Sequence, residues 1–118
     1  MAKKLSTEQL KNIALKKGYG KTQRHIFLCT NGKCHEKEGS ENLWKHLKSR
    51  LNELQPDHAE APVARSKADC LRICAAGPIA LVYPEKTLYH SLDEAKVDEI
   101  IEKHLFQGEI VTEHSIEL

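Results

Sequence analysis

The sequence predicts an α/β domain in which a mixed four-stranded sheet is flanked by helices. Two observations support this fold class. Short apolar runs typical of buried strands alternate with stretches in which apolar residues recur at helical spacing. After a short first helix, the order also continues with a strand-helix-strand unit and closes with a hairpin and a last helix. The 118 residues suit one domain with its own core.

Three helices are predicted from their caps and their apolar spacing. Ser6 and Gln9 form a capping box that predicts a short first helix. The clearest helix is predicted to begin at a cap at Ser40, because leucines then recur every three or four residues. A second capping box, Ser91 with Glu94, predicts the last helix.

Four short runs are predicted to form strands. Residues 24–29 and 79–83 are apolar runs, residues 63–67 alternate, and residues 87–90 follow a turn that makes them the second strand of a hairpin. The long helix joins the first two, so we expect these to be parallel and connected by a right-handed crossover. A tight turn joins the last two as an antiparallel hairpin.

Charge and hydropathy exclude several classes of protein. Lys and Arg number 18 against 17 Asp and Glu, and the formal net charge of +1 gives no global field for nucleic acid or an anionic membrane. No apolar run approaches a membrane span, and the N-terminus lacks the apolar region of a signal peptide. We therefore expect a soluble, cytoplasmic protein with no nucleic-acid and no membrane partner.

All four cysteines fall in two tight pairs, Cys29 with Cys34 and Cys70 with Cys74. Each pair follows a predicted strand, and the carboxyl ends of neighbouring parallel strands meet at one edge of a sheet. In a reducing cytosol such thiols are expected to bind metal or carry out redox chemistry rather than form structural disulfides. The spacing therefore predicts a four-thiolate metal site at one edge of the sheet.

The ligand count does not identify the metal, because zinc and iron-sulfur clusters both accept four thiolates. Structural zinc usually holds together a module that lacks a core, whereas this chain has apolar helices and strands of its own. The plant-type ferredoxin spacing needs a third cysteine where this chain has Lys37. A Rieske centre is disfavoured because no histidine adjoins the second cysteine pair.

Several stretches together resemble one family. They are His25-Ile26-Phe27-Leu28-Cys29-Thr30-Asn31, the loop from Cys70 to Cys74 with Ala76-Gly77-Pro78, residues 79–84, and residues 98–105 with Gly108-Glu109. Over residues 24–110 the chain resembles the thioredoxin-like 2Fe-2S ferredoxins. The short first cysteine interval is also similar to that of the small 2Fe-2S subunit of NADH dehydrogenases and bidirectional hydrogenases. Those subunits carry a long N-terminal helical region, and its absence before residue 24 favours a free-standing ferredoxin.

The resemblance implies a thioredoxin-like fold with a single 2Fe-2S cluster in the two cysteine loops. The ligands it implies are Cys29, Cys34, Cys70 and Cys74. It further implies a one-electron carrier rather than an enzyme, a homodimer, and a flavoprotein or another iron-sulfur protein as redox partner. The corresponding division of the chain is an N-terminal helical extension at 1–23, the ferredoxin domain at 24–110, and a C-terminal tail at 111–118.

Three alternatives stay open at this point. The domain could be an electron-transfer subunit of an NADH dehydrogenase or hydrogenase, a structural four-cysteine zinc protein, or a cluster-based redox sensor. A thioredoxin-type thiol protein is disfavoured because the Cys-x-x-Cys motif is missing. Candidate docking contacts for an acidic partner are Lys33, His35, Lys37 and Arg72.

Overall fold

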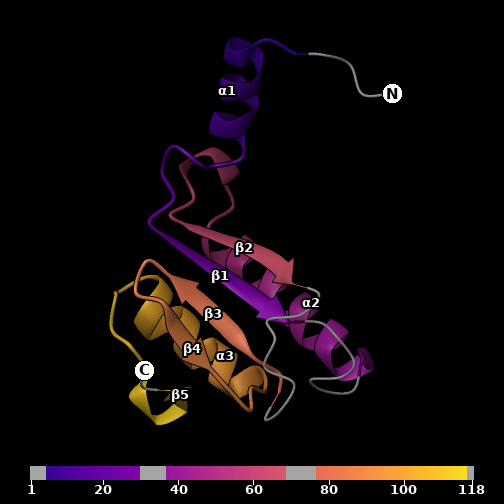
Figure 1. The fold of residues 1–118 in the computed structure, drawn as a ribbon, viewed down its shortest axis with the longest axis vertical. Coiled ribbons are helices and arrows are strands. Elements are labelled where there is room, and N and C mark those ends of the chain that lie inside the picture. Colours follow the sequence, from indigo (N-terminus) through magenta and orange to yellow (C-terminus); the bar gives the residue numbers. More distant parts are fainter. Residues whose placement is uncertain (1–4, 30–36, 69–76, 117–118) are drawn as a thin grey trace.

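The computed structural model describes residues 5–29, 37–68 and 77–116 (Figure 1). Its elements are α1 (Thr7–Lys16), β1 (Arg24–Cys29), α2 (Lys37–Leu54), a 3-10 turn (His58–Glu60), β2 (Val63–Ala68), β3 (Ala80–Tyr83), β4 (Thr87–Tyr89), α3 (Glu94–Ile100) continued by a π-helical turn (Ile101–Leu105), a 3-10 turn (Thr112–His114) and β5 (Ser115–Ile116). The strands form one mixed sheet in the order β2-β1-β3-β4-β5. The predicted α/β class is confirmed.

The four predicted strands are present with the predicted directions. β1 and β2 are parallel neighbours, and β3 is antiparallel to both β1 and β4. The sheet also has a fifth strand, because β5 pairs antiparallel with β4 through Leu88 opposite Ile116 and Tyr89 opposite Ser115. A strand of two residues is too short to produce a periodic pattern, so the sequence predicts only the other four strands.

Both long helices cover the same face of the sheet, and α2 and α3 pack against each other there (Figure 1). Successive side chains of a strand point to opposite faces, and in β1 the buried Ile26 and Leu28 join the helices in one core. The core comprises Ile26, Leu28, Leu43, Leu47, Leu51, Val63, Ala80, Val82, Tyr89, Leu92, Val97, Ile100, Ile101, Leu105 and Val111. The leucine repeat that predicted the long helix is thus its buried stripe.

Two of the predicted helix caps are wrong. α2 begins at Lys37, so Ser40 lies inside the helix rather than at its start. Ser91 has a φ of 51°, which is outside the extended region that an N-cap requires, and Asp93 caps α3 by accepting a hydrogen bond from the Lys96 N–H at 2.8 Å. The capping box of Ser6 with Gln9 is confirmed. Within the described residues, no helix is long and apolar enough to cross a bilayer.

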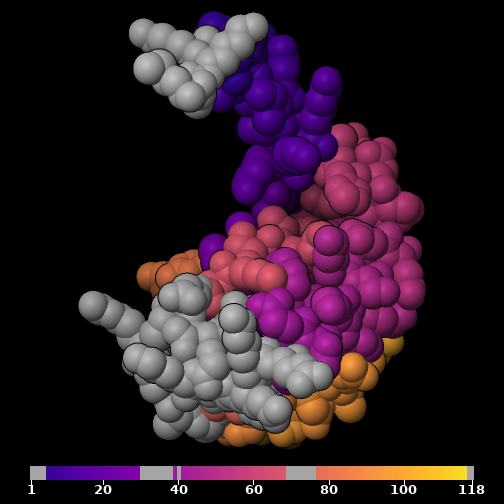
Figure 2. All heavy atoms as spheres, turned by 90° about the vertical axis from the view of Figure 1, so that its right-hand side faces the viewer, coloured from indigo at the N-terminus to yellow at the C-terminus, as the bar shows by residue number. Residues whose placement is uncertain are grey.

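The predicted first helix forms, but its apolar side chains are not buried. Leu10 is 52% exposed and Ile13 is 47% exposed, and α1 stands away from the sheet (Figures 1 and 2). Its carboxyl end is anchored through Gly18, which has a φ of 91°. A Cβ there would lie 2.3 Å from the His58 carbonyl oxygen, so only glycine permits this contact.

The buried stripe of α2 should dominate stability, and a matched pair of leucines tests this. Leu47 is fully buried, whereas Leu54 on the same helix is 48% exposed. We expect Leu47→Ala to lower the free energy of unfolding by about 3 kcal/mol and Leu54→Ala by less than about 1 kcal/mol, as measured by urea denaturation. Equal losses from the two substitutions would contradict this position of the core.

Candidate metal centre

The flanks of both cysteine-bearing segments meet at one end of the sheet. Cys29, the last residue of β1, is paired in register with Ala68, the last residue of β2. The backbone N–H of Cys29 also donates a hydrogen bond of 3.0 Å to the Ile79 carbonyl oxygen, just beyond the second cysteine segment. Parallel pairing therefore brings together the points where the chain leaves and re-enters the sheet around both predicted loops.

Cys29 lies on the face of the sheet opposite the two long helices. It is fully buried and packs with Ile79 and the half-buried Leu88. A buried thiolate needs a balancing positive charge, because burial in apolar surroundings opposes ionisation. Sulfur is also a soft donor that suits iron-sulfur clusters and zinc. The position and chemistry of Cys29 therefore fit a metal centre.

The remaining three predicted ligands, Cys34, Cys70 and Cys74, lie outside the described residues. The predicted docking contacts Lys33, His35 and Arg72 lie outside them as well, and Lys37 is placed only as the first residue of α2. The structure thus locates one predicted ligand and the described ends of the segments that carry the others.

An aromatic cluster lies on the same face of the sheet as Cys29. The rings of His25 and Phe27 are stacked with centroids 4.2 Å apart, and Tyr83 meets Phe27 edge-on at 6.1 Å. His25 Nε2 lies 2.8 Å from the Ser66 hydroxyl, and burial lowers the pKa of His25. The alternation of β1, which points residues 25, 27 and 29 away from the helices, is the sequence signal for this cluster. Cys29 therefore adjoins an aromatic surface.

A second group of polar side chains lies at the opposite end of β1. Tyr89 Oη is 2.7 Å from His104 Nδ1, and His104 Nε2 is 2.7 Å from a Glu85 carboxylate oxygen. Arg24 donates to both oxygens of Glu85, at 3.1 and 3.3 Å, and the Val111 N–H donates to Tyr89 Oη at 3.1 Å. A carboxylate only accepts, so His104 Nε2 carries a proton; in the neutral ring Nδ1 then accepts the tyrosine hydroxyl proton.

This chain of hydrogen bonds satisfies a fully buried histidine. Burial by itself would raise the pKa of Glu85, but Arg24 and His104 outweigh burial and hold the pKa below its ordinary value. Burial raises the pKa of Tyr89. The sequence alone does not predict this network, because its members are far apart in the chain. The one signal is His104, a histidine at an apolar position of the last helix.

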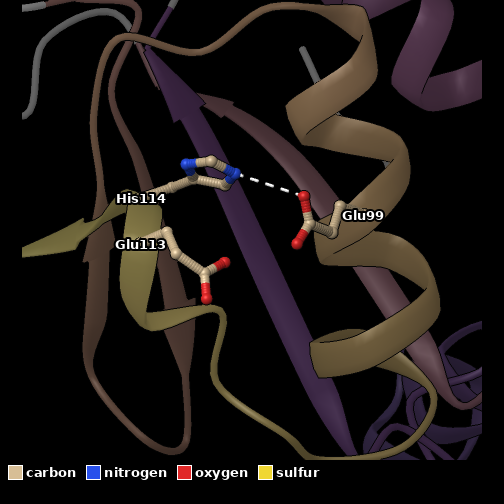
Figure 3. A group of neighbouring side chains, drawn as sticks. All are labelled: Glu99, Glu113 and His114. Carbon is tan, nitrogen blue, oxygen red and sulfur yellow. Dashed lines mark hydrogen bonds and ion pairs between the residues drawn. The ribbon is translucent and has the colours of Figure 1, made fainter.

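A third cluster joins α3 to the segment before β5. Glu99, Glu113 and His114 offer ligand atoms within 4.8 Å of one another (Figure 3). His114 Nε2 lies 3.2 Å from one Glu99 oxygen, and Lys103 Nζ lies 3.2 Å from the other. These two partners lower the pKa of Glu99, His114 having the larger effect. Its donors are oxygen and imidazole rather than thiolate, and Glu99 is already paired, so the cluster fastens the C-terminal segment and does not suit an iron-sulfur site.

Sequence comparison with known proteins identifies one family. The family model of the thioredoxin-like 2Fe-2S ferredoxins matches residues 16–105. A 2Fe-2S ferredoxin of Clostridium pasteurianum is 32% identical over 93 residues, which cover 75% of this chain and 91% of that protein. A 2Fe-2S ferredoxin of Aquifex aeolicus is 29% identical over 96 residues, covering 75% and 84% of the two chains.

Comparison with solved structures identifies the same family. The structure of a thioredoxin-like 2Fe-2S ferredoxin from Aquifex aeolicus superposes with a TM-score of 0.70 and 26% identity, covering 81% of this chain and 92% of that one. The likeness therefore extends over most of both chains.

The carboxylate of Glu85 should stabilise the fold in a pH-dependent way. Because its pKa is lowered in the folded state, its contribution is fully present above the ordinary value of 4.5 and is lost as the pH falls through the lowered folded value. We expect Glu85→Gln to lower the free energy of unfolding by about 1–3 kcal/mol at neutral pH and by less in acid. Urea denaturation at about pH 7 and about pH 3 measures both values.

Glu102→Gln is the matched control, since Glu102 is exposed on the π-helical turn and should change stability by less than about 0.5 kcal/mol. A Glu85→Gln loss that does not shrink in acid would contradict the assignment of a charged Glu85 to this network.

Proposed function

The chain belongs to the thioredoxin-like 2Fe-2S ferredoxins, electron carriers that bind a 2Fe-2S cluster, and from this premise we propose that its four cysteines hold the cluster. The proposed ligands are Cys29, Cys34, Cys70 and Cys74. The observation that carries this assignment is the burial of Cys29 at the point where β1 and β2 end side by side. When bound, the cluster accepts and releases one electron.

Chain length is consistent with four sulfurs meeting near this point. Cys70 is two residues beyond Ala68 in the sequence, and two residues span at most about 7 Å. Cys34 follows Cys29 by five residues, and Cys74 precedes Ile79 by five. Since Cys29 is in register with Ala68 and hydrogen-bonded to Ile79, each of the other cysteines is tied closely in sequence to a residue beside Cys29.

The protein contributes position and environment to this chemistry. The β1–β2 pairing fixes the spacing between the two cysteine segments, and the burial of Cys29 with Ile79 and Leu88 keeps water away from one sulfur. Hydrogen bonding and solvent access around the sulfurs are the means by which a protein sets a cluster's potential. Electron transfer needs no protein acid, base or nucleophile, so the proposed role is that of a carrier and not of an enzyme.

A carrier requires a donor and an acceptor, and the family places this chain among proteins that exchange electrons with others. We propose a flavoprotein or another iron-sulfur protein as the partner and the cytoplasm as the compartment. The proposed homodimer is supported by the aromatic cluster beside Cys29, on the face opposite both long helices, where Tyr83 is 41% exposed.

The ligand assignment predicts the effect of replacing one cysteine. We expect Cys70→Ser to lose at least about half of its iron, sulfide and visible absorption, because a neutral hydroxyl replaces the soft thiolate that iron-sulfur clusters prefer. Lys33→Ala is the control and should keep the full cluster. The measurement is an absorption spectrum of anaerobically purified protein before and after dithionite, with iron, sulfide and zinc analysis.

In the same experiment the parent protein should contain two irons and two sulfides per chain and bleach on reduction. A Cys70→Ser protein with unchanged colour and redox behaviour would overturn the ligand assignment. A colourless parent with one zinc per chain would overturn the proposed cluster site and replace it with a structural metal site.

The proposed dimer predicts a change in mass when its aromatic surface becomes charged. We expect Tyr83→Lys to shift the protein from dimer to monomer by at least about tenfold in dissociation constant, since a buried charge opposes association. Sedimentation equilibrium measures this, with Tyr19→Lys, an exposed tyrosine near α1, as the control. A parent protein that is monomeric at all concentrations would contradict the dimer.

A further inference from the structure

A groove lies on the helix side of the sheet, along the edge strand β2. It has a volume of about 470 Å³ and is lined by Trp44 and Lys48 of α2, Arg65 of β2, and Lys17 and Tyr19 of the segment after α1, among others. Figure 2 shows α2 and β2 together on the side of the molecule where the N-terminal segment rises from the body. None of the proposals above uses this surface.

The groove is cationic and contains no acidic lining residue in the described part of the chain. Lys17, Lys48 and Arg65 line it, and within the described residues none of the three has a carboxylate partner. Arg65 Nε is buried and has no hydrogen-bond partner there, and burial lowers the pKa of Arg65. A buried donor without an acceptor costs stability, so Arg65 together with the two lysines makes the groove suited to an anion.

Trp44 indicates which kind of anion fits. The Arg65 guanidinium and the Lys67 ammonium each lie 5.8 Å from the centre of its ring. Two cations thus already use the indole ring, which disfavours stacking of a nucleotide base on it. Carboxylates need only the cations themselves, and Lys17, Lys48 and Arg65 all line the groove. A segment with several carboxylates therefore matches these three cations better than one nucleotide does.

The groove lies beside the first half of β2, and Arg65 is the lining residue of that strand nearest the cysteine end of the sheet. In register, Arg65 is opposite Ile26 and Lys67 is opposite Leu28, so both lie on the helix face of β2. Ala68, at the cysteine end of β2, is three residues beyond Arg65, about 10 Å along a strand. A partner bound in the groove would therefore have to extend about 10 Å along β2 to reach the end of the sheet that carries the proposed cluster.

We propose that this groove docks an acidic segment of the protein that exchanges electrons with this chain. The identification of the occupant as a redox partner rests on the proposed function. Carboxylates of the partner pair with Lys17, Lys48 and Arg65, and the pairing weakens with salt because the two lysines are at the surface. The groove holds and orients the partner, while electron transfer takes place at the proposed cluster at the cysteine end of the sheet.

The test uses the full-length, cluster-loaded protein and a fluorescein-labelled hexaglutamate peptide as the probe. Binding is followed by fluorescence anisotropy at about 20 mM salt, where charge pairing is weakly screened. We expect Lys48→Gln to raise the dissociation constant about fivefold and Lys17→Gln with Lys48→Gln to raise it about twentyfold. Lys45→Gln, on the same helix but outside the groove, should change it less than about twofold.

The outcomes separate this proposal from its alternatives. Equal weakening by Lys48→Gln and Lys45→Gln, or no binding by the parent protein, would overturn the docking groove. Binding of ADP that depends on Lys48, with no binding of hexaglutamate, would replace it with a nucleotide site. Every variant should keep the absorption spectrum of the parent, since none of these lysines is near a proposed ligand in sequence.

The same samples show whether a negative result contradicts the docking groove or the proposed ferredoxin function. A coloured, reducible protein that does not bind hexaglutamate keeps the ferredoxin site and overturns the groove. A protein without a cluster that still binds hexaglutamate through Lys48 keeps an acidic-segment site and overturns a redox protein as its occupant.

Discussion

The parallel pairing of β1 with β2 is the constraint on which the rest of the structure depends. Parallel neighbours need a long crossover, and here α2 supplies both that connection and the largest buried stripe of the core. The same pairing puts Cys29 beside Ala68, so two segments distant in sequence leave the sheet at one place. Core formation and the meeting of the flanks of the two cysteine segments thus have a single structural cause.

The two ends of β1 have contrasting chemistry. At its start, Arg24 belongs to a network in which Glu85, His104 and Tyr89 satisfy one another, which stabilises the junction of β1, the hairpin turn and the last helix. At its end, Cys29 is a buried soft donor beside apolar side chains. The strand separates the two groups by about 17 Å, so the charged network that stabilises the fold is remote from the proposed redox centre.

Periodic signals predicted most of this fold, whereas contacts between distant residues could not be predicted. The leucine repeat of α2 and the apolar runs of four strands depend on local spacing, so helix, sheet and strand directions followed from them. The start of α2, the cap at Asp93 and β5 depend on backbone geometry or on a partner strand, which a single sequence does not reveal. For the site, paired cysteines indicated a metal, but the buried setting of Cys29 came only from the sheet.

The alternation of side chains along β1 couples the packing of the core to the position of Cys29. Ile26 and Leu28 point to the helices, while Phe27 and Cys29 point the other way. A shift of the strand by one residue would exchange these sets, removing two core side chains and turning the cysteine into the hydrophobic interior. A mispaired chain would consequently lose its core packing and move the proposed ligand Cys29 to the other face in one step, so an error of strand register would oppose both stability and the proposed cluster site.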